Sequence, residues 1–240
     1  MESFTPEEER QKADRSRRMM TRLLVFAIVM FFAALTSAYL VSMNSTDYWM
    51  SFNVPKAFFI STAIIVASSV TMQLALWSAQ QGKSKLIVPL LAITLVLGGA
   101  FTYFQMKGWS ELADRKLNFI SKVLLAQGEQ GKDFTIAYKG VPMVLAEGNY
   151  YAADDAAKQY PLNAEMSEFK NMASAYFHVL TRAHYAHIAF GLMSLVIMLI
   201  MGLKGRYTPT ATTGLWAGAV YWHFLGGLWI YLLLFLHFVH

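Results

Sequence analysis

The chain has 240 residues and a formal net charge of +5, and it is 56% hydrophobic but only 15% charged. Soluble domains carry about 25% charged residues, so this composition excludes an ordinary soluble core. The basic residues flank long uncharged runs, which indicates orientation in a membrane rather than binding to nucleic acid. The sequence contains no cysteine, which excludes disulfides, thiolate metal sites and cysteine nucleophiles.

The amino-terminal segment, residues 1–22, is polar and basic, and we expect a cytoplasmic segment rather than a cleaved signal peptide. Five apolar runs follow, each long enough to cross ~30 Å of hydrocarbon as a helix at ~1.5 Å per residue. The sequence therefore predicts an all-α membrane protein with five transmembrane helices in a bundle. We place the spans at residues 23–43, 57–80, 86–106, 176–203 and 214–238.

Short basic segments predict the orientation of the spans. They precede span one, separate spans two and three, and separate spans four and five, so all lie on one side, which we expect to be the cytoplasm. The amino terminus would then be cytoplasmic and the carboxyl terminus periplasmic. The basic residues are Arg10, Lys12, Arg15, Arg17, Arg18, Arg22, Lys83, Lys85, Lys204 and Arg206.

This division makes residues 23–106 transmembrane helices one to three, residues 107–174 a long periplasmic loop, and residues 175–240 transmembrane helices four and five. The loop carries structure signals of its own. Residues 115–127 are an amphipathic helix candidate that ends at a glycine.

Two further signals lie in the second half of the loop. Residues 134–138 and 141–145 are candidates for a small hairpin. Asn163 is a candidate cap for a helix that continues into span four.

Polar side chains within the spans are the candidates for a functional site, because burying them in lipid is costly. His184 and His187 are three residues apart and share a helix face. They either contribute to a haem or metal site, or form hydrogen bonds and packing contacts between helices or at lipid headgroups. His223 has no histidine at its own level to complete a bis-histidine haem site, which favours the packing hypothesis.

None of the spans contains Asp or Glu, which argues against a stand-alone pump or ion transporter. We expect no catalytic, cofactor-binding or metal-binding residue in this chain. The candidates for lipid contact and packing are Arg182, His184, His187, Trp222, His223 and Trp109.

An ordered set of motifs lies along the five spans. Span one is rich in aromatic and small residues from Met30 to Tyr39, and span two carries a paired serine. The later motifs are Gln105 to Trp109, His184-Tyr-Ala-His187, and Tyr221-Trp-His-Phe224 with Trp229. Together they resemble subunit III of haem–copper oxidases, in the five-helix form found in bacteria.

The resemblance implies a non-catalytic subunit of an oxygen-reducing cytochrome c oxidase in the bacterial inner membrane. Such a subunit carries no haem or copper, has a lipid-filled cleft with bound phospholipid, and supports turnover and proton uptake in the catalytic subunit. The implied partners are catalytic subunit I, copper-bearing subunit II and a small subunit IV. The family's usual membrane carboxylates are replaced here by Ile28 and Gly226.

Two alternatives remain open from the sequence. One is an accessory subunit of a quinol oxidase or nitric oxide reductase, and the other is a small membrane cytochrome. The loop is longer than is usual in the family, and its residues 112–174 are a candidate docking surface for another respiratory complex or an idle insertion. No nucleic-acid partner is expected.

Overall fold

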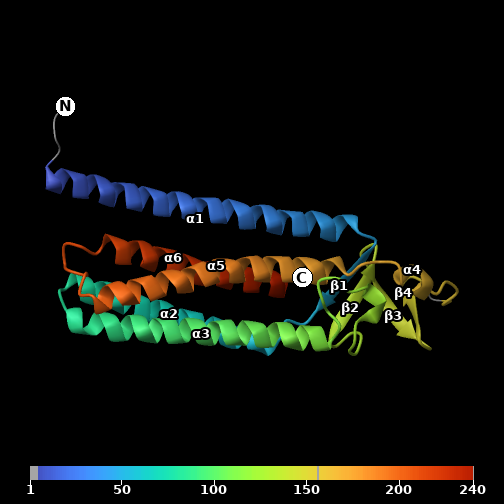
Figure 1. Cartoon of the computed structure of the whole chain (residues 1–240). Helices are drawn as coiled ribbons and strands as arrows, with labels where there is room; N and C mark the ends of the chain where they lie inside the picture. The colour runs from blue at the N-terminus through green and yellow to red at the C-terminus, as the bar shows by residue number, and fades with distance from the viewer. Residues whose placement is uncertain (1–4, 156, 240) are drawn as a thin grey trace. The chain divides into compact units, whose positions relative to one another are not determined.

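The computed structural model describes residues 5–155 and 157–239, and within them five helices are long and apolar enough to cross a membrane. Each predicted span lies inside one of these helices, so the five-helix fold is confirmed. The helices are α1 (Pro6–Ser45), α2 (Lys56–Gln80), α3 (Ser84–Asp114), α5 (Met172–Leu203) and α6 (Thr213–Phe238) (Figure 1).

Several helices extend well beyond their apolar spans. The longest, α1, has 40 residues, which gives a length of about 60 Å, twice the ~30 Å of hydrocarbon. The basic residues from Arg10 to Arg22 therefore lie on the same continuous helix as the first span. Similarly, α3 continues past the predicted end of its span to Asp114.

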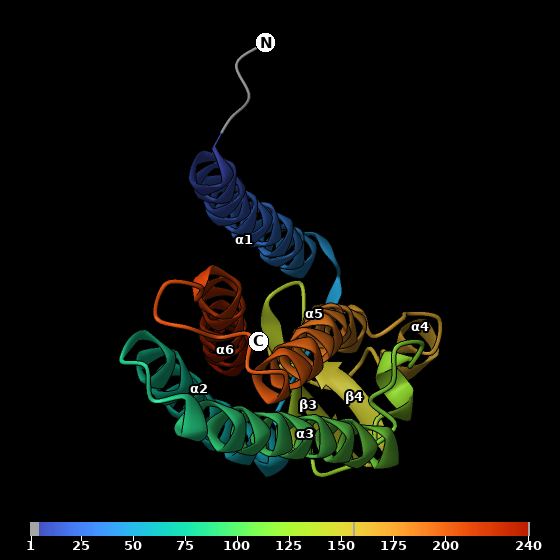
Figure 2. The same ribbon diagram turned by 60° about the vertical axis from the view of Figure 1, so that its left-hand side comes forward.

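The chain divides into two compact units, each built from parts of the long helices. The first comprises residues 1–31, 60–103 and 184–230, and the second comprises residues 32–59, 104–183 and 231–240. In the first unit, α2 and α3 lie side by side, and the hydroxyls of Thr71 and Thr94 are 2.7 Å apart. The part of α1 in this unit lies on the side of α5 and α6 (Figure 2).

The core of the first unit is supplied mainly by α2, α3, α5 and α6. Among its described side chains, α1 contributes one buried apolar residue, Ile28, and its other apolar residues there are exposed or half-buried. Exposed apolar residues are expected where lipid or a partner helix covers a helix. The largest buried side chains in this core are Trp222, Trp229, Phe101, Ile65, Met72 and Leu91.

The second unit contains a four-stranded antiparallel sheet in the order β1-β2-β3-β4. The strands are β1 (Tyr48–Phe52), β2 (Phe134–Tyr138), β3 (Val141–Ala146) and β4 (Asn149–Ala152). The predicted hairpin is confirmed as β2 and β3. Lys139 and Gly140 at its turn have φ values of 46° and 82°, the left-handed conformation that tight hairpin turns require.

Strand β1 was not foreseen in the sequence. It pairs along its whole length with β2, from Tyr48 opposite Tyr138 to Phe52 opposite Phe134. The connection between α1 and α2 and the long loop after α3 therefore contribute to one sheet and lie on the same side of the membrane. Burial also raises the pKa of the Tyr48 phenol, which holds this side chain neutral in the sheet.

Two predictions for the loop are wrong. Residues 115–127 do not form a helix, because the chain leaves α3 after Asp114, Lys116 adopts a φ of 59°, and only a short 3₁₀ turn follows at Val123–Leu125. Asn163 does not cap a helix that runs into span four.

Instead, Asn163 opens α4 (Asn163–Met166), which ends before α5 begins. Its side-chain oxygen accepts a hydrogen bond from the Tyr150 backbone N–H at 2.7 Å, and its amide group donates to the Gly148 carbonyl at 3.1 Å. The Asn163 side chain therefore binds the backbone of β4 and of the turn between β3 and β4.

Candidate functional site

Trp222 lies at the centre of the packing between helices in the first unit. Its indole N–H donates to the Ser68 hydroxyl at 2.7 Å, which joins α6 to α2. The ring needs the small residues beside it, because a Cβ atom added at Gly98 or Gly191 would lie 2.9 Å or 3.1 Å from it. Small residues permit such close approach between helices in lipid.

His184 is 1% exposed and is surrounded by aromatic rings. It stacks on Trp229 with ring centroids 5.4 Å apart, and the Phe101 ring meets it edge-on at 6.3 Å. Trp229 in turn donates its indole N–H to the Thr62 hydroxyl at 2.9 Å. This geometry makes His184 part of an aromatic stack between α3, α5 and α6.

His187 faces a different neighbour, although it shares the helix with His184. Its ring lies 6.2 Å from that of Phe31 on α1, and its backbone carbonyl accepts the Tyr221 hydroxyl at 3.1 Å. His223 lies apart from both, with its Nε2 atom 3.0 Å from Gln73 Oε1. The structure therefore does not bring these three histidines to one point.

Trp109 and Arg182 lie together in the second unit. The guanidinium carbon of Arg182 is 5.8 Å from the Trp109 ring centroid, which is a cation–π distance. The Trp109 indole N–H donates to the Thr181 hydroxyl at 3.1 Å and so joins α3 to α5. The Arg182 side chain is exposed and can offer its N–H donors to a phosphate.

Several partners of these residues were missed in the sequence. Thr62 and Gln73 accept hydrogen bonds from α6, as Ser68 does, so polar residues along one helix meet aromatic and histidine side chains along the next. The sequence signal for these partners was a row of polar residues on the otherwise apolar second span. Their partners could not be predicted, because they depend on how α2 and α6 align.

His178 was also overlooked. It is 1% exposed, and its ring nitrogen Nε2 lies 2.9 Å from the Leu117 carbonyl oxygen. It therefore attaches the segment that follows α3 to the start of α5. Its place near the amino-terminal end of a long apolar helix was the only sequence signal.

The chemistry of the site is that of packing between helices. Within residues 5–155 and 157–239, no group of three or more His, Asp or Glu side chains is arranged to hold a metal ion. His178 binds the segment that follows α3, and the other tryptophan and histidine side chains described above contact neighbouring helices through hydrogen bonds or ring contacts. This arrangement joins helices in the bilayer.

No protein-family model matches the chain. The chain is 23% identical over 218 residues to cytochrome c oxidase subunit 3 of Corynebacterium diphtheriae, a match that covers 88% of this chain and 82% of that protein. The chain is a distant relative of cytochrome c oxidase subunit 3. This similarity confirms the resemblance to subunit III of haem–copper oxidases that its motifs indicate.

The match covers a smaller share of two other relatives that carry the same name. The chain is 26% identical over 174 residues to cytochrome c oxidase subunit 3 of Alkalihalophilus pseudofirmus, a match to 61% of that protein. It is 25% identical over 173 residues to the same subunit of Papio hamadryas, a match to 46% of that protein. The chain thus spans less than two thirds of these two relatives, and its similarity extends to bacterial and eukaryotic proteins.

Proposed function

We propose that this chain is the non-catalytic subunit III of a bacterial haem–copper terminal oxidase of aerobic respiration. The observation that carries the proposal is the similarity along 88% of the chain to a protein named cytochrome c oxidase subunit 3. The arrangement of the spans supports it, because their tryptophan and histidine side chains contact neighbouring helices. A subunit of this kind stabilises the catalytic subunit and supports oxygen reduction coupled to proton translocation.

The exposed apolar surface of α1 supports a partner within the membrane. Phe26 is 63% exposed and Met30 is 55% exposed, although both lie within the first span. In the proposed complex, catalytic subunit I, copper-bearing subunit II and a small subunit IV surround this chain, with phospholipid between helices. Haem and copper are then held by the partner subunits.

The proposed location is the bacterial inner membrane, with a cytoplasmic amino terminus and a periplasmic carboxyl terminus. The sheet supports this orientation, because β1 and β2 require the two connections that carry them to lie on one side. The basic connections at Lys83 and Lys85 and at Lys204 and Arg206 fall on the other side, as expected for cytoplasmic loops.

Ile28 and Gly226 stand where related subunits usually carry a membrane carboxylate, and the surroundings of these two residues bear on how this subunit supports proton uptake. Ile28 is 5% exposed and packs into the core of the first unit. A Cβ atom at Gly226 would lie 3.2 Å from the Ser69 hydroxyl, so this position serves close packing between α6 and α2. We therefore propose that the chain supports proton uptake by holding the catalytic subunit in place, without a membrane carboxylate of its own.

Two surface features complete the proposal. Arg182 and Trp109 are proposed to bind the phosphate of a lipid, because the guanidinium is exposed beside an aromatic ring of the kind found at membrane interfaces. The loop within residues 112–174 is proposed to dock a neighbouring respiratory complex. Its exposed apolar residues support this idea, and they include Phe119, Ile120, Leu125, Val144, Leu145 and Tyr160.

Purification of the intact complex tests the proposed function. The tagged full chain, isolated from its native membrane in a mild detergent, is expected to retain subunits with haem absorption bands and cytochrome c-dependent oxygen uptake. Quinol-dependent oxygen uptake, or nitric oxide consumption, would assign the chain to another haem–copper enzyme. Isolation without any haem-bearing subunit would refute membership of an oxidase, and haem bound to the isolated chain would make it a cytochrome.

A further inference from the structure

The segment after α3 carries two exposed apolar side chains between two buried ones. Leu117 and Val123 are each 2% exposed and fix the ends of this stretch in the core of the second unit. Between them, Phe119 is 47% exposed and Ile120 is 78% exposed, and these two residues form the tip of the segment. Two adjacent large apolar side chains on a fixed stretch of backbone indicate a surface that another molecule covers.

Hydrogen bonds hold the tip beside the start of α5. The Ser174 hydroxyl donates to the Asn118 carbonyl at 3.0 Å, and the Asn171 backbone N–H donates to the Ser121 carbonyl at 2.8 Å. The tip lies between these two bonded carbonyls in the chain. Its backbone is therefore level with residues 171–174, just beyond the apolar part of α5.

The start of α5 also marks the level at which the hydrocarbon ends. The predicted fourth span begins at Tyr176, and its hydroxyl is 2.7 Å from that of Ser42, one residue before the predicted end of span one. The Phe58 ring, at the start of span two, is 5.6 Å from the Phe177 ring. Three spans therefore begin or end at one level. Residues 171–174 lie two to five residues beyond it, which is about 3–8 Å along a helix.

This height places the tip in the headgroup layer of the bilayer. Hydrocarbon and headgroups together span ~40–45 Å and the hydrocarbon alone ~30 Å, so each headgroup layer is about 5–7 Å thick. Phenylalanine and aliphatic side chains of interfacial segments bury themselves at this boundary. A bilayer of ordinary thickness therefore reaches the tip.

Two lysines beside the tip lie directly opposite each other. Lys122 and Lys170 form an isolated antiparallel bridge, and both side chains are exposed. Like charges opposite each other in such a pair are destabilising, and no carboxylate of a described residue lies within 4.0 Å of either ammonium group. Residues 115–127 contain no Asp or Glu, and the flanking Asp114 and Glu168 leave the surface positive. An anion beside the two lysines would offset their repulsion.

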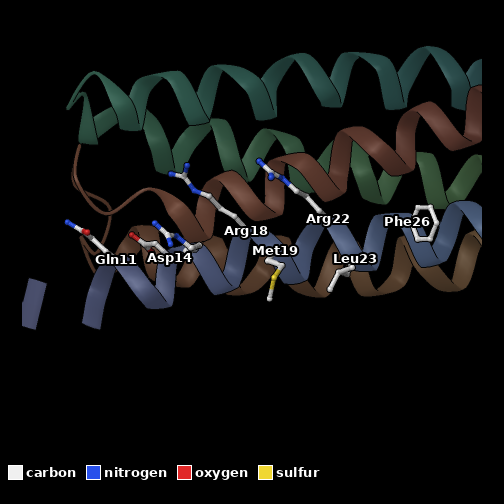
Figure 3. A pocket seen from close by; sticks show the side chains of 8 residues that line it. Gln11, Asp14, Arg18, Met19, Arg22, Leu23 and Phe26 are labelled. Carbon is white, nitrogen blue, oxygen red and sulfur yellow. The ribbon is translucent and has the colours of Figure 1, made fainter. Parts of the chain in front are cut away.

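The basic residues of α1 have a different explanation. The guanidinium carbon of Arg18 is 5.4 Å from the Trp216 ring centroid, and Figure 3 shows Arg18 and Arg22 directed toward the neighbouring helices. Their charge also follows the orientation rule for short segments next to a span. That rule does not extend to long segments such as the one between α3 and α5. It therefore does not account for the two opposed lysines.

We propose that residues 115–127 bind the anionic surface of the bilayer, with the tip among the headgroups and Lys122 and Lys170 on lipid phosphates. The site lies on the loop, outside the packing between the helices, and it leaves Val144 and Leu145 for the proposed docking of a neighbouring complex. The inference goes beyond the proposed function and does not rest on membership of an oxidase. A partner protein with apolar and acidic side chains is the competing occupant, and the height of the tip favours the bilayer.

A single fluorophore can report where the tip lies, because the chain contains no cysteine. The full chain with Ile120→Cys is labelled and placed in nanodiscs of phosphatidylglycerol and phosphatidylcholine. We expect strong quenching by a lipid that carries a spin label at its headgroup, and weak quenching by a neutral quencher dissolved in water. Val144→Cys is the matched control and should show the reverse. Val144 is 47% exposed on β3, which lies farther than β1 from the ends of α3 and α5 (Figure 1).

Two results of this experiment would overturn the proposal. A label at Ile120→Cys that is quenched from water as strongly as the label at Val144→Cys would show that the tip is outside the bilayer. A label at Ile120→Cys that is protected from both quenchers would show that protein covers the tip.

The double variant K122Q/K170Q tests the contact with phosphate. In nanodiscs that contain phosphatidylglycerol, the ratio of lipid-inserted to water-exposed label at Ile120→Cys should fall about fivefold for each lysine removed. Phosphatidylcholine alone should give a similarly low ratio for the chain that keeps both lysines. Lys158→Gln removes an exposed lysine elsewhere in the loop and should leave the ratio unchanged. An unchanged ratio in K122Q/K170Q, or an equal loss for each lysine in Lys158→Gln, would refute binding at the lysine pair.

Discussion

The Trp222 indole N–H donates a hydrogen bond to the Ser68 hydroxyl at 2.7 Å, and both residues are almost fully buried. The bond joins α6 to α2 at a depth where water is not available as a substitute partner. A buried donor that loses its acceptor also loses the hydration it had in water, so the free energy of unfolding should respond to either residue.

Replacing Ser68 with alanine should lower the free energy of unfolding by about 1 kcal/mol, because hydrogen bonds between membrane helices contribute about 0.6–1.7 kcal/mol. Thermal unfolding of the purified protein in detergent measures the change. The adjacent Ser69→Ala is the matched control and should shift the midpoint less. Equal shifts for the two variants would show that the bond to Trp222 does not stabilise the packing.

Gly98 and Gly99 are neighbours with opposite surroundings. A Cβ atom at Gly98 would lie 2.7 Å from Leu192 and 2.9 Å from Trp222, whereas one at Gly99 would meet no described atom within 4 Å. Gly98→Ala should therefore destabilise the protein by about 1–3 kcal/mol through overpacking. Gly99→Ala should be neutral or stabilising by up to about 1 kcal/mol, because alanine favours helix. The same thermal assay compares them, and the reverse order would contradict the packing described.

The histidine pair of α5 provides a test of the packing role. Replacing His184 and His187 together with glutamine should leave the haem and copper content per catalytic subunit unchanged, because His184 stacks on Trp229 and His187 contacts α1. The melting temperature should fall, since a buried ring contact is lost. Metal analysis and haem spectra of the complex measure the first effect, and a proportional loss of metal would count against a packing role.

The orientation can be tested by labelling, because the chain contains no cysteine. A cysteine introduced at Lys83 or Arg206 should be protected from an impermeant maleimide in intact cells and should react after the cells are broken. A cysteine at Tyr160, which is 72% exposed in the loop, should react in intact cells. The opposite pattern would invert the proposed topology.

The docking role of the loop is best tested at its surface. Val144 and Leu145 are each 47% exposed, and the double variant V144K/L145K should weaken association with a neighbouring complex on native gels. Thr135→Lys adds charge at an exposed polar position and serves as the control. Unchanged assembly and oxygen uptake in V144K/L145K would reject docking through this surface. Deletion of residues 130–161 is less informative because it removes β2.

The five spans were predictable because a long apolar run has one stable solution in a bilayer, a helix that satisfies its own backbone. The sheet was only half predictable. Its β2–β3 hairpin is local in sequence, whereas β1 acquires its partner from a distant segment and is too short to be recognised alone. The role of Asn163 was ambiguous in the sequence, because an asparagine side chain can either cap a helix or bind a turn. Tertiary contacts determine which of the two roles it takes.

The candidate site was also predictable only in part. The sequence identified the polar and aromatic side chains of the spans, because such residues are costly in lipid. It did not identify which residues they would meet. Phe134 and Val144 are both apolar residues of the loop that the sequence predicts as a docking surface, but Phe134 is 5% exposed and belongs to the core of the sheet, whereas Val144 is 47% exposed. Only the fold could separate these two.

The pairing of β1 with β2 also sets an order of events during synthesis. Residues 48–52 emerge early, but their partners, residues 134–138, follow only after α2 and α3 have been made and inserted. Until then the backbone of β1 must be hydrated, and closing the long intervening loop carries an entropic penalty. The second unit therefore completes its fold late, after the third helix has crossed, and a ribosome stalled before residue 134 would leave the first connection open to protease.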